Sequence, residues 1–101
     1  MLSAGVTLSF TNTPTANAGS GGNACDLSYA LNALASVGSG TWTKQTGTGT
    51  ASFTPNANNP NATASVTSYD TYTFRWTETN GSCTDFDEIT VIFQEAPTSN
   101  A

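Results

Sequence analysis

Two cysteines are the residues of this chain whose chemistry is easiest to predict. Cys25 and Cys83 are the only cysteines in a sequence of 101 residues that has seven acids, two bases and no histidine. A cysteine pair in a small domain of this composition is typical of an extracellular, oxidising compartment, and it predicts a disulfide. Two free thiols are the alternative.

Three carboxylates near Cys83 form the second candidate group. Glu78, Asp85 and Asp87 offer the hard oxygen ligands that calcium takes, so they predict a calcium site if their side chains converge. Calcium is the one cofactor that the sequence suggests. The alternative, which we favour, is that these acids are solvated, as acid clusters in such a composition usually are.

A hairpin signal determines where those carboxylates point. Asn80-Gly81 predicts a two-residue type I′ turn, and the resulting register places Ile89 opposite Tyr72. The same register directs the three carboxylates toward the interior, where they could not be buried unpaired as anions. A β-bulge between residues 83 and 89, which would turn the aspartates outward and Phe86 inward, is therefore expected.

The composition argues against several functional classes. With a formal net charge of −5 and only two bases, the chain has almost no positive charge with which to bind a phosphate backbone, so no nucleic-acid partner is expected. Without histidine, the usual pairs of nucleophile and base cannot be assembled, which predicts that the protein is not an enzyme. No apolar run approaches the roughly 18 to 20 residues of a membrane span, so membrane insertion is not expected either.

The elements that must position these residues are predicted to be strands. Apolar residues recur with a period of two along the chain, and each run ends at a cluster of Gly, Pro, Asn or Ser. About seven such strands predict an all-β, antiparallel β-sandwich. Trp42 packed against Trp76 is expected at its centre. The predicted core consists of the apolar residues that share one parity in their strands, namely Leu31, Trp42, Phe53, Tyr72, Phe74, Trp76, Val91 and Phe93.

The two ends of the chain carry the same pattern. Residues 6–18 align without a gap with residues 89–101 at a constant offset of 83, and six of the thirteen positions are identical. An echo that keeps both the alternation and a proline predicts a tandem array with a period of 83 residues. Residues 1–12 would be the last strand of a preceding repeat, 13–95 one full repeat, and 96–101 the linker that opens the next. The predicted inter-repeat strand and its joints comprise Val6, Leu8, Phe10, Pro14 and Pro97.

Several motifs, taken in order, resemble a known family. They are Pro14-Thr-Ala-Asn-Ala-Gly19, Gly38-Ser-Gly-Thr-Trp42, Tyr72-Thr-Phe-Arg-Trp-Thr77, Asn80-Gly-Ser-Cys83 and Asp87-Glu-Ile-Thr-Val91. The set is similar to the Ig-like or PKD-like repeats of very large surface proteins of gliding bacteria, which the type IX secretion system exports. The resemblance covers nearly the whole chain. It implies a secreted or cell-surface stalk or adhesin repeat and brings no catalytic residues with it.

An Ig-like topology also bears on the cysteines. Cys25 before the second strand and Cys83 after the sixth would lie at opposite poles, roughly 20 to 26 Å apart for six to eight residues of strand. A disulfide needs Cα atoms within about 7 Å. A bond within the domain, which we expect because small secreted domains usually cross-link themselves, therefore requires a first segment that crosses between the poles. A bond to a neighbouring repeat is the alternative.

The expected function is mechanical. The repeat would space an adhesive or anchoring region away from a cell, with similar repeats joined head to tail as its partners and surface glycans or proteins as further candidates. Two alternatives come from other classes. A fibre-forming subunit would assemble by donating the strand at residues 6–10 to a neighbour's sheet. A carbohydrate-binding module would need an aromatic side chain exposed on a sheet face or loop.

Overall fold

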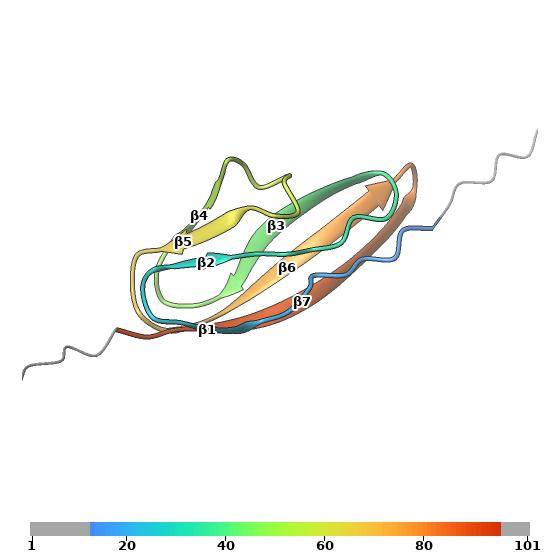
Figure 1. Ribbon diagram of the computed structural model, residues 1–101. Coiled ribbons are helices and arrows are strands. Elements are labelled where there is room, and N and C mark those ends of the chain that lie inside the picture. Colours follow the sequence, from blue (N-terminus) through green and yellow to red (C-terminus); the bar gives the residue numbers. More distant parts are fainter. Residues whose placement is uncertain (1–12, 96–101) are drawn as a thin grey trace, which may run out of the picture.

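Seven strands in two sheets make up the fold in the computed structural model, which describes residues 13–95 (Figure 1). The strands are β1 (Gly22–Ala24), β2 (Ser28–Ala30), β3 (Ser39–Thr46), β4 (Ala51–Thr54), β5 (Thr63–Val66), β6 (Thr71–Asn80) and β7 (Cys83–Phe93). One sheet has the order β1-β7-β6-β3, and the other has the order β2-β5-β4. The predicted all-β sandwich of about seven strands is confirmed.

Alternation along β6 explains how the two sheets enclose a core. Its buried residues, Tyr72, Phe74, Trp76 and Glu78, point to the second sheet, while the threonines and Arg75 between them point outward. This period of two is the backbone geometry of a strand with one face buried. The inward residues of β6 therefore line the centre of the sandwich.

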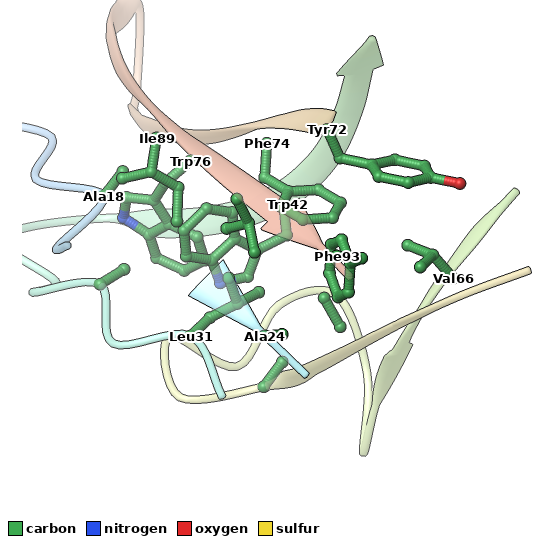
Figure 2. Packing of buried hydrophobic residues seen from close by; sticks show 14 residues of the cluster. Ala18, Ala24, Leu31, Trp42, Val66, Tyr72, Phe74, Trp76, Ile89 and Phe93 are labelled. Carbon is green, nitrogen blue, oxygen red and sulfur yellow. The ribbon is translucent and has the colours of Figure 1, made fainter. Parts of the chain in front are cut away.

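The core is built around two tryptophans (Figure 2). Trp42 and Trp76 are each 1% exposed, and their ring centroids lie 5.3 Å apart at an angle of 50°. Gly40 is required beside them, because a Cβ at that position would overlap the ring of Trp76. Of the predicted core residues, Leu31, Trp42, Tyr72, Phe74, Trp76, Val91 and Phe93 are buried, and Phe53 is half-buried against them.

The register of the β6–β7 hairpin differs from the predicted one. Phe74, not Tyr72, lies opposite Ile89, and Asn80 pairs with Cys83, so the two loop residues are Gly81 and Ser82. Gly81 has a φ of 63° and no residue other than glycine has a positive φ among residues 13–95, which is the pattern of a type II′ turn. The turn lies one residue later than expected, and every partner shifts by two.

The prediction of a bulge in β7 was also wrong. Pairing with β6 runs without interruption from Cys83 to Ile92, and Phe86 is 51% exposed. Because the register error is two residues, side-chain parity is unchanged, so Asp85 and Asp87 keep the inward parity of Ile89. They need no bulge because other parts of the chain supply hydrogen-bond donors to them, as described below.

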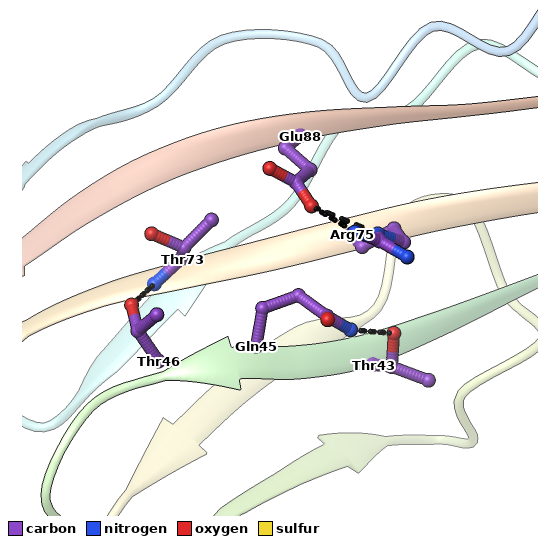
Figure 3. Close-up of polar contacts among 6 residues, drawn as sticks. All are labelled: Thr43, Gln45, Thr46, Thr73, Arg75 and Glu88. Atoms are coloured by element: carbon purple, nitrogen blue, oxygen red, sulfur yellow. Dashed lines mark hydrogen bonds and ion pairs between the residues drawn. The ribbon is translucent and has the colours of Figure 1, made fainter.

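The irregularity in this sheet lies in β3 instead. The register with β6 shifts between Lys44 and Thr46, and the Thr46 hydroxyl accepts the N–H of Thr73 at 3.1 Å (Figure 3). On the same outer face, the Gln45 amide donates to the Thr43 hydroxyl at 2.8 Å (Figure 3). A bulge at the end of an edge strand is an ordinary way to limit further pairing there.

The described chain enters and leaves at opposite poles of the sandwich. Its first segment starts near the β6–β7 turn, runs alongside β7 and becomes β1, which pairs in parallel with the last residues of β7 (Figure 1). On the way, Asn17 bridges to Leu34 beside the other sheet. β7 then exits at the far pole. The chain therefore enters the module through the first segment and leaves it through β7, and these two segments are parallel neighbours.

Candidate functional site

Residues 13–95 form no pocket, and among them no three acids or cysteines are close enough to hold a metal ion together. The same range contains no helix long and apolar enough to cross a membrane. The candidate site is therefore a surface: the pole at the β6–β7 turn, where the three predicted carboxylates, the entering chain and Cys83 meet.

Glu78 is the buried centre of this pole. Its side chain is on the inward parity of β6 and is 1% exposed. The loop before β3 supplies donors, because the Ser36 hydroxyl donates to Oε1 at 2.7 Å and the Ser36 N–H at 3.0 Å. The Val37 N–H donates to the same oxygen at 3.3 Å, and the Trp76 indole donates to Oε2 at 2.9 Å. A buried carboxylate is thus fully hydrogen-bonded and ties a loop to the core.

Two opposing effects set the pKa of Glu78. Burial by itself raises the pKa, but hydrogen bonds from the Ser36 hydroxyl, the Trp76 indole and the backbone of Ser36 and Val37 together lower it by more, so the net pKa lies below the ordinary value of 4.5. A carboxyl whose pKa is lower in the folded state contributes stability above its unfolded pKa and loses that contribution as pH falls through the folded pKa.

We therefore expect the melting temperature to fall when the pH is lowered from 5 toward 3, with part of the loss due to Glu78. The Glu78→Gln variant removes the titrating group, so its melting temperature should be lower at neutral pH but less dependent on pH in this acid range. Thermal unfolding followed by circular dichroism from pH 3 to pH 7 measures both slopes. Identical acid slopes in the two proteins would contradict this role for Glu78.

Asp85 and Asp87 hold the entering segment against β7. Oδ2 of Asp85 accepts the N–H of Ala16, and Oδ2 of Asp87 accepts the N–H of Ala18, both at 2.9 Å. In each case the partners are separated by 69 residues. The β1–β7 pairing continues with that same separation, since Gly22 lies beside Val91. Two side chains therefore extend a parallel pairing where the backbones themselves are not paired.

The carboxylates are thus brought to one side of the pole but are engaged separately. Glu78 and Asp85 are opposite each other in the β6–β7 ladder, yet Glu78 binds the loop before β3 and Asp85 binds the entering segment. Both oxygens of Glu78, and Oδ2 of each aspartate, accept hydrogen bonds from N–H or O–H groups of the protein. This arrangement favours a structural role over the calcium site considered from the sequence.

Removing the two aspartates is expected to loosen the entering segment. The Asp85→Ala and Asp87→Ala variants should each lower the free energy of unfolding by about 1 to 2 kcal/mol, because each leaves a partly buried N–H without its charged acceptor. Hydrogen exchange at the amides of Ala16 and Ala18 should accelerate. Glu88→Ala is the matched control, since Glu88 is the neighbour of Asp87 on the outer face. Unchanged protection in the aspartate variants would show that other contacts hold this segment.

The two cysteines lie at opposite poles and are both free thiols. Cys83 begins β7, and Cys25 follows β1, whose last residue Ala24 pairs with Phe93 at the end of β7. The strand between them separates the thiols by roughly 33 Å, far beyond the reach of a disulfide. The expected bond within the domain is therefore wrong. The first segment runs the full length of β7 before it reaches Cys25, and so carries that thiol to the far pole.

Exposed aromatic residues were not predicted from the sequence. Both tryptophans are buried, whereas Phe86 is 51% and Tyr69 is 46% exposed. The guanidinium of Arg75 lies 3.9 Å from the ring centroid of Phe86. It also forms an ion pair with Glu88 at 2.7 Å (Figure 3). Because Arg75 covers one face of the ring, Phe86 is a poor platform for stacking a sugar. Its exposure follows from its parity, which is opposite to that of Ile89.

Comparisons with known proteins identify the fold. No protein-family model matches the chain, and no curated protein sequence matches it. Among solved structures, the chain is similar to the solution structure of the PKD domain from KIAA 1837 protein, with a TM-score of 0.70 and 23% sequence identity. The match covers 92% of this chain and 98% of that one. At this level of identity the likeness concerns the fold, and the chain has the Ig-like β-sandwich fold of a PKD domain.

Proposed function

We propose that this domain is a structural spacer, one module of a tandem array that holds another region of an extracellular protein away from a cell. The observation that carries the proposal is the position of the two poles, at which the described chain enters and leaves (Figure 1). Modules of this shape, joined end to end, extend in one direction. The sequence echo at an offset of 83 residues supplies the corresponding joint.

The residues of the predicted joint support this reading only in part. Pro14 is buried at the entry pole. Val6, Leu8, Phe10 and Pro97 lie outside the described residues, as do the predicted boundary segments 1–12 and 96–101. Their roles as inter-repeat strand and linker are part of the proposal.

The arrangement of the terminal segments suits a load-bearing role. Tension between the two poles would pull the entering segment and β7 in opposite directions along their common axis. The β1–β7 ladder and the hydrogen bonds to Asp85 and Asp87 lie across that axis. They would be loaded together in shear, so that many must break at once. This is the geometry expected of a module that keeps its fold while it transmits force.

The family resemblance extends the proposal to a source and a location. Repeats similar to this one occur in large adhesins or filaments of gliding bacteria that pass through the type IX secretion system, and we propose the same surface context and a non-catalytic role here. The near absence of charge on a surface rich in Ser, Thr and Asn suits a stalk whose neighbouring copies must not adhere to each other electrostatically.

A second candidate function is assembly by strand donation. Within residues 13–95, strand pairing on the β1 side of β7 covers only Val91–Phe93, and the entering segment lies along the rest of this edge without strand pairing. An extended strand such as residues 6–10 of another copy could pair with this edge by displacing the entering segment. Deleting residues 1–12 separates the candidates, because a spacer module should remain a stable monomer and a donor subunit should lose assembly.

The experiment that tests the proposed function is the sequence of the gene on both sides of this segment. The proposal predicts further copies of the module at intervals of 83 residues, each keeping the two tryptophans and the proline joint. Flanking segments unrelated to the module on both sides would contradict the tandem array and the spacer role inferred from it.

A further inference from the structure

We propose that Cys25 of each module forms a disulfide with Cys83 of the module that follows it. The proposal rests on the proposed function, because it needs a second module joined head to tail. It assigns a partner to two thiols that the fold keeps apart. The argument depends on how the entering segment, β7 and the joint are aligned.

The first step is the register along β7. At Ala16, Ala18 and Gly22–Ala24, the entering segment lies beside the β7 residue 69 positions later. At the exit pole the Gln94 N–H donates to the carbonyl of Ala24 at 2.8 Å, so Cys25 lies next to the chain as it leaves the module. Continued two residues beyond Ala16, the same register would place Pro14 alongside Cys83.

The second step is the joint. The offset of 83 between the two ends of the chain makes residue 97 the counterpart of Pro14 in the next module. Cys83 of that module would then lie beside residue 97, three residues after Gln94, which is beside Cys25 of the preceding module. Three residues span at most about 10 Å. A modest bend at the joint would bring the Cα atoms within the about 7 Å that a disulfide needs, whereas the thiols of one module are roughly 33 Å apart.

The third step is chemistry and access. Cys25 is exposed and Cys83 is partly exposed, so both thiols can be reached by an oxidant. Bond formation removes one hydrogen from each sulfur, joins the two sulfurs and passes two electrons and two protons to a disulfide-bearing exchange partner, which is reduced to its dithiol form. An extracellular compartment maintains such oxidants. Each module in an array would thus be cross-linked to both neighbours, which would restrict bending at every joint.

The test uses a two-module chain made of residues 1–101 followed directly by a second copy of residues 19–101. Residues 96–101 serve in it as the counterparts of 13–18. After oxidation with glutathione disulfide, non-reducing digestion and mass spectrometry should find one cross-link, between Cys25 of the first copy and Cys83 of the second. Cys83 of the first copy and Cys25 of the second should still react with a thiol reagent.

Matched serine variants make the result specific. Cys83→Ser in the second copy should abolish the cross-link, and Cys83→Ser in the first copy should leave it complete. Four reactive thiols in a chain whose two copies are both folded, or a bond within one copy, would overturn the cross-link and leave the spacer function standing. A second copy that fails to fold on this joint would instead overturn the repeat arrangement, and the cross-link with it.

Discussion

Replacing Glu78 with alanine is expected to lower the free energy of unfolding by about 3 to 4 kcal/mol, which corresponds to a fall in melting temperature of roughly 15 to 25 °C for a domain of this size. The variant removes the acceptor for the N–H groups of Ser36 and Val37 and for the buried indole N–H of Trp76. Each donor left unsatisfied in the interior adds its own cost. Equilibrium unfolding in urea at pH 7 measures the difference.

The control for this variant is Glu88→Ala on the neighbouring strand. Glu88 forms an ion pair with Arg75, but their side chains are 36% and 34% exposed. Partly exposed pairs of this kind contribute at most about 1 kcal/mol. A Glu78→Ala variant no less stable than Glu88→Ala would show that the carboxylate at the pole is not a structural element.

Replacing Trp42 with alanine is expected to cost about 3 to 5 kcal/mol, because it leaves a large cavity opposite Trp76 that the two sheets cannot close. The two rings are in contact at the centre of the core, and both are 1% exposed (Figure 2). The variant should either unfold near room temperature or lose the near-ultraviolet circular dichroism signal of packed aromatic side chains. Calorimetry of the folded fraction measures the loss.

Phe86→Ala is the comparison that isolates burial from aromatic character. Phe86 is also an aromatic residue of the larger sheet, but its side chain is half exposed and contacts Arg75. Its removal should cost less than about 1 kcal/mol, since it creates no cavity. Equal losses in the Trp42 and Phe86 variants would contradict the division between core and outer face.

Strand alternation made much of the fold predictable. The pattern of Tyr72, Phe74 and Trp76 among threonines identifies β6 and the face that it buries, because alternation is a direct consequence of strand geometry. It also predicted eight core positions, of which seven are buried and one, Phe53, is half-buried. The hairpin register was missed because Gly81 can occupy either position of a two-residue loop, and only the pairing of the whole ladder selects between them.

The candidate site was less predictable because its donors come from distant segments. Alternation correctly gives Glu78, Asp85 and Asp87 the inward parity, and the apparent conflict with burial suggested a bulge. The conflict is resolved by N–H groups of Ala16 and Ala18 and by the loop at Ser36, which are 69 and 42 residues away in the chain. No local pattern of residues shows that these groups approach.

The cysteines illustrate the same limit in another way. Their separation into two poles follows from an Ig-like topology, whereas the expected bond within the domain rests on the general tendency of small secreted domains to cross-link themselves. The parallel course of the first segment along β7 decides against it. It also places Cys25 and Cys83 at the two poles, where each could bond to a cysteine of a neighbouring module.

A spacer function requires that the modules extend in line, and the maximum dimension of the two-module chain in solution shows whether they do. Small-angle X-ray scattering should give a maximum dimension that exceeds that of the single module by about the length of β7, roughly 35 Å. A compact particle, with the second module folded back beside the first and little increase in length, would contradict the spacer function.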